Sequence, residues 1–249
     1  EETRLGIPVI IFDEALHGLV RGGATAFPQS IALAATFDTT LVSRVSAAIA
    51  RETAGRGIRQ VLSPVVNLAT DVRWGRGEET YGEDPCLSAG MGVSFVKNFE
   101  RMGVITTPKH FVANSGDGGR DSNPIHYTER FLEETHLVPF KACFQQGGSQ
   151  SVMTAYNMLD GTPCTANSWL NIEKLRKEWG FDGFTIADAD AVGIIHKLHH
   201  TIGNWAEAGA TAVNNGLDVI FQTTYEEHEP FLEACRSGLI TEEALNRAV

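Results

Sequence analysis

The chain has 249 residues, of which 43% are hydrophobic and 20% are charged, and its formal net charge at pH 7 is -11. This length can bury a substantial core, and the composition is that of a globular protein rather than a disordered one. The negative charge, without any local cluster of lysine or arginine, argues against nucleic acids and acidic membrane surfaces as partners. No apolar run approaches the roughly 18 residues that a membrane-spanning helix needs.

Short apolar runs alternate with segments of helical periodicity along the chain, which is typical of βαβ units and a parallel sheet. Six runs are expected to be strands: Val9–Phe12, Val61–Val66, Ile105–His110, Ser151–Tyr156, Phe184–Asp188 and Val213–Ile220. A complete (β/α)8 barrel has eight strands. We therefore predict an α/β fold, a (β/α)8 TIM-like barrel that is incomplete or irregular at its N-terminus.

Helical segments are expected between these strands. Asp38 can cap a helix on which Leu41 and Val45 recur at helical spacing, and Gly55 or Gly57 can end it. The other expected helices are Ser88–Arg101, Thr128–Gln146 with an interruption near Pro139, Asn171–Trp179, Glu226–Arg236 and Thr241–Val249.

The domain organisation is expected to be simple, because no repeat or linker divides the chain. One barrel domain over residues 1–249 is the economical interpretation. The expected strands are two fewer than the eight of a complete barrel. Either two strands have too little hydrophobic contrast with their neighbours to be recognised, or the chain is a fragment of a longer multidomain protein, and we favour the fragment.

The sequence contains no motif for a cofactor. No glycine-rich nucleotide-binding pattern follows a strand, so no nucleotide cofactor is predicted. The four cysteines are far apart and lack a Cys-x-x-Cys pair, which argues against a zinc or redox motif, although a disulfide stays open if the protein is exported. They are Cys86, Cys143, Cys164 and Cys235. His196, His199 and His200 lie on an expected helix with few acidic neighbours, so no metal is predicted there.

Polar or charged side chains stand at the C-terminal ends of five successive expected strands. They are Asp13, Arg76 together with Arg73, Lys109 together with His110, Tyr156, and Asp188. In a parallel α/β fold these strand ends meet on one face, where the chemistry is carried. Two long loops, 67–85 and 112–126, follow strand ends and can bring further polar groups to the same face. Together with aromatic Tyr156 and Trp74, such groups suit the hydroxyls and faces of a sugar ring.

Taken singly, each of these residues also has a purely structural interpretation. Asp188 and Asp13 could cap the helices that follow them. Arg76 could pair with Glu78, Glu79 or Glu83. Lys109 is the hardest to explain in this way, because a lysine that ends an apolar strand needs an acidic partner or a ligand.

Five stretches in the same order resemble the N-terminal barrel domain of glycoside hydrolase family 3, the family of many β-glucosidases, β-xylosidases and β-N-acetylhexosaminidases. They are Gly6–Gly18, Pro64–Pro85 with its Arg73-Trp74-Gly75-Arg76 and Tyr81-Gly82-Glu83-Asp84-Pro85, Lys109–Phe111, Ser151–Asn157, and Trp179–Asp188. The resemblance implies a retaining exo-acting β-glycosidase in which Asp188 is the nucleophile. It also implies that sugar hydroxyls are held by Asp13, Arg76, Lys109, His110 and Tyr156, with Met153 beside them. A periplasmic or secreted location is favoured by the same resemblance.

The chain also departs from the pattern of this family. Ala187 precedes Asp188 where the family often has serine, and Asp190 follows as a second carboxylate, which we expect to raise the pKa of Asp188 by like-charge repulsion and to lower activity. Most members take their general acid/base from a C-terminal domain that this sequence lacks, so we expect such a domain as a partner.

Two alternative functions stay open at this point. One is a non-catalytic carbohydrate-binding or scaffold barrel. The other is a β-N-acetylhexosaminidase-like enzyme with its acid on the 112–126 loop, where Asp121 or His126 is the candidate; Arg120 and Asp121 could instead reach the sugar. Asp121-Ser122-Asn123 has asparagine where that branch of the family has histidine.

Overall fold

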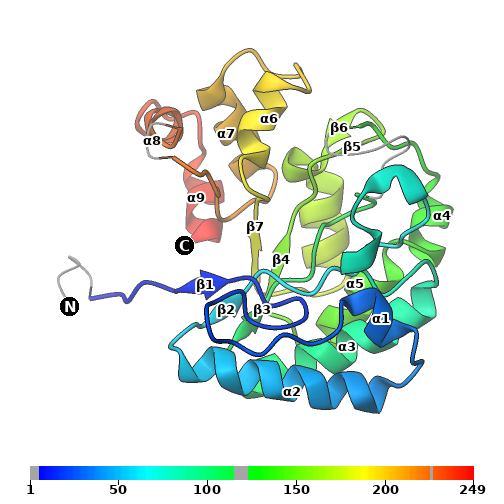
Figure 1. Cartoon of the computed structure of the whole chain (residues 1–249). Coiled ribbons are helices and arrows are strands. Elements are labelled where there is room, and N and C mark those ends of the chain that lie inside the picture. Colours follow the sequence, from blue (N-terminus) through cyan, green and yellow to red (C-terminus); the bar gives the residue numbers. More distant parts are fainter. Residues whose placement is uncertain (1–5, 115–122, 225–226) are drawn as a thin grey trace.

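The computed structural model describes residues 6–114, 123–224 and 227–249. Its centre is a series of short parallel strands that follow one another in chain order (Figure 1). Strands β1 (Phe12–Asp13), β2 (Gln60–Val61) and β3 (Ile105–Thr106) form one sheet, and β4 (Ser151–Met153) pairs with β7 (Phe184–Ile186).

Backbone hydrogen bonds continue between and beyond these two sheets. Beyond β3, the amide of Phe111 donates to the carbonyl of Met153 at 2.7 Å. On the far side of β7, Ile186 forms a parallel bridge with Val219. Six neighbouring segments therefore run in the same direction, so their C-terminal ends lie at one edge, as the polar residues of the sequence require.

Five of the six expected strands overlap an observed strand, although each observed strand is shorter, and β1 and β2 share only one residue with the expected runs. The expected strand Val213–Ile220 is wrong at its start, because helix α7 covers Trp205–Asn214 and only Val219 forms a bridge. Alanines fill this helix and Asn204 caps it by accepting from the amide of Glu207 at 2.9 Å. Gly216, at φ +107°, then turns the chain toward Val219.

The helices of the described residues surround this series of strands. They are α1 (Ser30–Ala34), α2 (Thr39–Gly55), α3 (Pro85–Arg101), α4 (Glu129–Glu134), α5 (Val138–Ala142), α6 (Ala191–Lys197), α7 (Trp205–Asn214), α8 (Glu229–Arg236) and α9 (Glu242–Ala248). The other elements of the described ranges are two π-helical segments, Cys143–Gly147 and Trp169–Glu178, three 3-10 turns, Val72–Trp74, Gly77–Glu79 and Cys164–Ala166, and a hairpin of β5 (Met158–Leu159) with β6 (Thr162–Pro163).

Most helix boundaries follow from the local chemistry that the sequence shows. The Asp38 carboxylate accepts from the amides of Thr40 and Leu41 at 2.9 Å, so the expected cap of α2 is confirmed. The segment expected at Thr128–Gln146 is interrupted, and Pro139 lies in the first turn of α5, where its missing amide proton costs nothing. The histidine prediction is partly wrong, because α6 ends at Lys197 and only His196 is helical.

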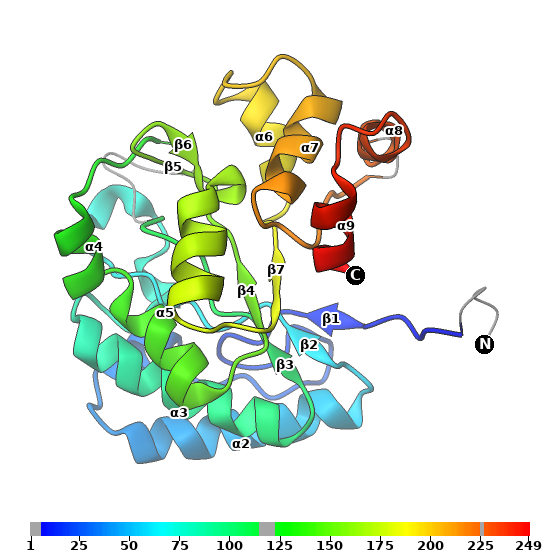
Figure 2. The ribbon, with the colours of Figure 1, turned by 180° about the vertical axis from the view of Figure 1, so that it is seen from behind.

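Separate hydrophobic clusters fasten the helices to the strands. Ile49 of α2 and Phe95 of α3 pack with Val61 of β2, and both helices lie on the same side of the first sheet (Figure 2). Val192 of α6 packs with Phe231 of α8 in another cluster, and helices α6–α9 gather at the opposite end of the molecule. No helix within the described ranges is both long and apolar enough to cross a membrane.

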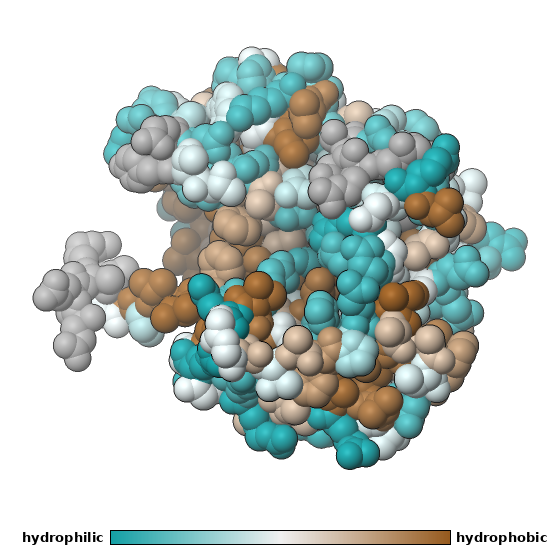
Figure 3. Space-filling view, viewed as in Figure 1, coloured by the Kyte–Doolittle hydropathy of each residue, from teal (hydrophilic) through white to brown (hydrophobic). Residues whose placement is uncertain are grey.

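An apolar surface is exposed along the segment that leads into β1. Ile7, Val9, Ile10 and Ile11 are 49–81% exposed, and Phe12 is 39% exposed. Figure 3 shows these hydrophobic side chains beside a hollow that separates the N-terminal strand from the C-terminal helices. The Phe12 ring meets that of Phe221 edge-on, with centroids 5.4 Å apart, so the two ends of the series of strands approach each other at this point.

Gly183 stands where β7 approaches β4, and a larger residue should separate these strands. A Cβ at this position would lie 2.2 Å from the backbone oxygen of Gln150, which accepts from the amide of Phe184. We expect Gly183→Ala to lower the free energy of unfolding by about 1–3 kcal/mol, as overpacking does. Urea unfolding measures this, with Gly55→Ala as control because nothing lies within 4 Å of a Cβ there. Equal stability of Gly183→Ala and the wild type would contradict the tight contact.

Candidate active site at the strand ends

Asp188 lies just beyond the C-terminal end of β7 and is buried, with 8% of its surface exposed. The amide of Ala189 donates to its Oδ1 at 2.8 Å. Its other oxygen, Oδ2, lies 3.5 Å from Nε2 of His110 and has no hydrogen-bond partner among the residues described. One carboxylate oxygen is therefore fixed and the other is available to a reacting atom.

His110 is held in place by Asn67, which lies at the end of the β2 segment. The Asn67 Oδ1 accepts from the His110 amide at 2.6 Å and lies 3.0 Å from His110 Nδ1, while Asn67 Nδ2 donates to the His110 carbonyl at 2.9 Å. Because Asn67 Oδ1 is an acceptor, the His110 proton is on Nδ1. The other ring nitrogen, Nε2, is the one that faces Asp188. Asn67 was not among the predicted site residues, although it belongs to a quoted family stretch.

Lys109 is 3% exposed and finds its acidic partner in Glu14, with which it forms an ion pair. Glu14 also accepts from the Ser63 hydroxyl at 3.3 Å. Asp13, which was predicted to hold a sugar hydroxyl, pairs with Arg21. The contact with the buried lysine is made by Glu14, which was not among the predicted site residues.

Arg76 comes from the long loop between β2 and α3, and its guanidinium is largely buried. Nε and Nη2 each donate to a different oxygen of Glu79 at 2.7 Å, which fixes the plane of the guanidinium. Of the three glutamates considered, Glu79 makes this contact. Arg73 differs, since its side chain is 64% exposed and paired with Asp71.

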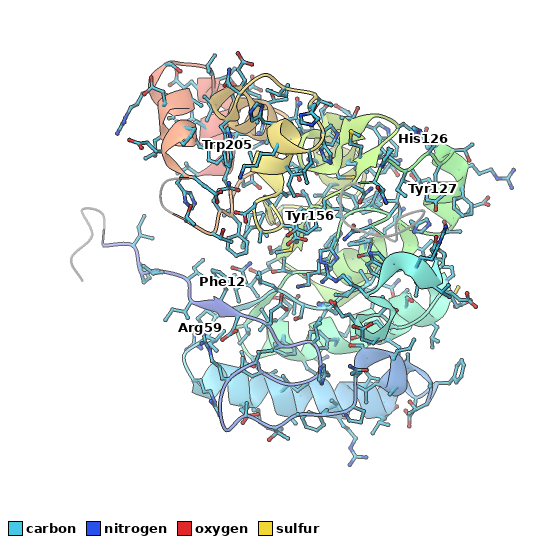
Figure 4. All side chains as sticks on the ribbon, turned by 45° about the horizontal axis from the view of Figure 1, so that its top comes forward. Phe12, Arg59, His126, Tyr127, Tyr156 and Trp205 are labelled. Carbon is cyan, nitrogen blue, oxygen red and sulfur yellow. The ribbon has the colours of Figure 1, made fainter. Side chains whose placement is uncertain are left out.

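Tyr156 follows β4 and reaches across to the chain beyond β7. Its hydroxyl donates to the carbonyl of Ala189 at 2.8 Å, next to Asp188. In Figure 4 it lies between the helices that include Trp205 and the strand that carries Phe12. Met153 is 1% exposed and packs with Leu62 and Ile186 in an apolar cluster, so its place in the protein is among core residues of the strands.

Burial raises the pKa of Asp188 to about 6, because the charged form loses water. Lys109, the Ala189 amide, Arg76 and the Tyr156 hydroxyl act in the opposite direction. The predicted rise is present, but burial and not like-charge repulsion is its largest cause. The Asp190 carboxylate accepts from the amide and hydroxyl of Thr223 at 2.9–3.1 Å instead.

The loop expected to hold an alternative proton donor is described only in part. Arg120 and Asp121 lie outside the described residues. His126 is described; its side chain is 70% exposed and lies 3.2 Å from Asp160 on the β5–β6 hairpin. In the described ranges, no three His, Cys, Asp or Glu side chains are grouped so that they could hold a metal ion.

Comparison with known proteins identifies the family of this chain. The N-terminal domain of glycosyl hydrolase family 3 matches residues 1–249. The chain belongs to this family. A β-xylosidase of Formosa agariphila is 38% identical over 231 residues, which are 87% of this chain and 32% of the relative. A periplasmic β-glucosidase of Salmonella typhimurium is 35% identical over 99% of this chain and 32% of its own length.

Solved structures of the family have the same fold as this chain. A β-glucosidase from Erythrobacter marinus superposes with a TM-score of 0.93 at 36% identity, over 99% of this chain and 34% of that one. A Listeria innocua β-glucosidase solved with glucose superposes with a TM-score of 0.90 at 31% identity, over 99% of this chain and 35% of that one. This family 3 chain spans about a third of the length of these relatives.

The raised pKa of Asp188 predicts a stability gain when its charge is removed. The ordinary pKa is 3.8 and the folded value about 6, so the stability contribution of this group is fully present below pH 3.8 and is lost as the pH rises through 6. Asp188→Asn abolishes this loss, so its gain in stability over the wild type should be larger at pH 7 than at pH 4, by up to about 3 kcal/mol. Urea unfolding of both proteins at the two pH values measures the difference, and a gain independent of pH would show an unperturbed Asp188.

Proposed function

We propose that this chain is the N-terminal part of a retaining, exo-acting β-glycosidase of family 3 that cleaves terminal β-linked sugars, most simply β-glucosides. One observation carries the proposal. A buried carboxylate, Asp188, has one oxygen fixed and the other available, at the end of a strand. The names of the relatives, β-glucosidases and β-xylosidases, support the same substrate class.

In this proposal Asp188 attacks the anomeric carbon through Oδ2. The bond between Oδ2 and C1 forms while the bond from C1 to the leaving oxygen breaks, and that oxygen takes a proton from the general acid. Water then attacks C1 and releases the sugar from Asp188. In this second step the general acid, now deprotonated, acts as the base and takes a proton from the water. A carboxylate of pKa about 6 is ionised at pH 7, so it can act as nucleophile without being deprotonated first.

The surrounding side chains would bind the sugar hydroxyls. Lys109 and Arg76 offer donors, His110 Nε2 offers an acceptor because the ring proton is on Nδ1, and Tyr156 offers a hydroxyl and an aromatic face. Glu14, which already accepts from Lys109, offers a carboxylate oxygen to a hydroxyl. We include Glu14 in the sugar site, while Asp13 and Met153 stay predictions on the strength of the family resemblance.

The general acid/base has to come from elsewhere in this proposal. Retaining chemistry places it about 5–5.5 Å from the nucleophile. The chain spans only about a third of its relatives, so we infer that a C-terminal domain of the parent protein supplies it. The hexosaminidase-like alternative depends on Asp121, outside the described residues, or on His126, which Asp160 contacts on an exposed hairpin.

We also infer that the strands belong to one (β/α)8-like catalytic barrel domain of a longer multidomain glycosidase. The supporting observations are six parallel segments in chain order and exposed apolar residues at both ends of the series, including Val9 and Val219. Further strands paired there would cover these residues.

Treatment with 2-deoxy-2-fluoro-β-glucosyl fluoride tests the nucleophile. The fluoride leaves without protonation, so the chain should gain the mass of one fluorosugar on the peptide that contains Asp188 even without the general acid. Asp188→Ala should gain none, whereas Asp182→Ala, an exposed control in the same segment, should react like the wild type. A folded wild-type chain that forms no adduct, or an adduct that survives in Asp188→Ala, would refute the proposed nucleophile for β-glucosides.

Removal of the Lys109 ammonium should weaken sugar binding. A hydrogen bond to a charged group contributes about 1.5–3 kcal/mol, so we expect Lys109→Met to raise the Kd for a glucose-like inhibitor by that free energy. Calorimetric titration measures the affinity, and Lys177→Met is the matched control because Lys177 is 65% exposed and pairs with Glu173 on the helix surface. Equal affinity of Lys109→Met and the wild type would remove Lys109 from the sugar site.

A further inference from the structure

The chain around Asp188 makes an unusual turn at Asp190. Asp190 has φ +62°, a left-handed backbone conformation that non-glycine residues adopt at a cost of order 1 kcal/mol or more. Such a conformation persists only where the surroundings hold it. Asp190 opens helix α6 but does not cap it through its side chain, so helix capping does not explain this residue.

Both the backbone and the side chain of Asp190 bind one neighbouring segment, 221–223. Its amide donates to the carbonyl of Phe221 at 2.9 Å. Its Oδ1 accepts from the amide of Thr223 at 2.9 Å, and the Thr223 hydroxyl lies 3.0–3.1 Å from both carboxylate oxygens. Four polar contacts thus join the turn that carries Asp188 to a segment 33 residues later.

Segment 221–223 is itself anchored to the floor of the site. Phe221 packs against the cluster of Leu62, Met153 and Ile186, and its ring meets that of Phe12. On the other side of the turn, the Tyr156 hydroxyl holds the carbonyl of Ala189. The Ala189 amide that fixes Asp188 Oδ1 therefore lies between two anchors, Tyr156 and Asp190.

We propose that Asp190 is a positioning residue that clamps the turn of the Asp188 nucleophile onto segment 221–223 and so directs Oδ2 at the anomeric carbon. This inference rests on the proposed function of Asp188. It assigns Asp190 no contact with the sugar. Loss of the clamp lets the turn rotate about Tyr156, and a displacement of about 1 Å at the reacting atom is enough to slow a reaction by up to about a hundredfold.

The variant Asp190→Gly tests the clamp without adding backbone strain. Glycine adopts φ +62° freely, so this variant removes the carboxylate contacts and leaves the fold relaxed. Asp160→Gly is the matched control, because Asp160 also has a positive φ, at 48°, and lies on the β5–β6 hairpin away from this turn. Thr223→Val removes the hydroxyl on the partner side, and Thr224→Val is its control.

The first measurement is the rate at which the fluorosugar reacts with the whole 249-residue chain at increasing reagent concentration. We expect Asp190→Gly to lower the maximal rate about tenfold with little change in the half-saturating concentration, since the sugar-binding groups are untouched. Thr223→Val should lower it less, and both controls should match the wild type. A purely structural role would reduce the fraction of chain that reacts but leave its rate constant unchanged, and that result would overturn the proposal.

The second measurement does not depend on activity. Hydrogen exchange followed by mass spectrometry should show faster exchange of the backbone amides at positions 190 and 223 in Asp190→Gly than in the wild type. Asp160→Gly should show no such change at these two positions. Unchanged exchange would refute the clamp. A wrong assignment of the nucleophile gives a different result, because the wild type itself would then form no adduct. The hydrogen-exchange result would still test the clamp in that case.

Discussion

The Asp188 carboxylate is buried, and the other charges of the site are arranged around it. A charged group that is 8% exposed is unfavourable unless other charges and donors compensate it. Lys109 and Arg76 do so in part, but each is itself largely buried and needs its own acid, Glu14 and Glu79 respectively. The site is therefore a network of alternating charges, in which each member makes the burial of the next one tolerable.

The backbone beneath this network limits how far its charges can move. Asp188, His110 and Tyr156 follow three neighbouring strand segments, and Met153 of β4 and Ile186 of β7 pack in one apolar cluster with Leu62. A packed core deforms little, so the distance of 3.5 Å between His110 Nε2 and Asp188 Oδ2 is set by the strands. Preorganisation of this kind favours chemistry in which charge develops at one fixed point.

The sequence predicted the strand ends well because apolar runs and the polar residues after them are local signals. It could not show that Glu14 pairs with Lys109, because the two residues are 95 positions apart in the chain. Stability of the helix α7 likewise depends on packing against α6 and α8, and the apolar residues near Val213 suit a strand equally well. The contacts of Asn67 with His110 and of Asp190 with Thr223 join distant parts of the chain, which no local pattern reveals.

The four residues from Ala187 to Asp190 show why the departures from the family pattern are tolerable. Ala187 is fully buried in the cluster with Val192 and Ala208, so a serine hydroxyl there would need a partner that alanine does not. The Asp190 carboxylate is bound to Thr223, so the second acid contributes backbone geometry more than repulsion. The departures at Ala187 and Asp190 suggested a weakened nucleophile. They are compatible with an intact one, because Ala187 packs in an apolar cluster and the Asp190 carboxylate is bound by Thr223.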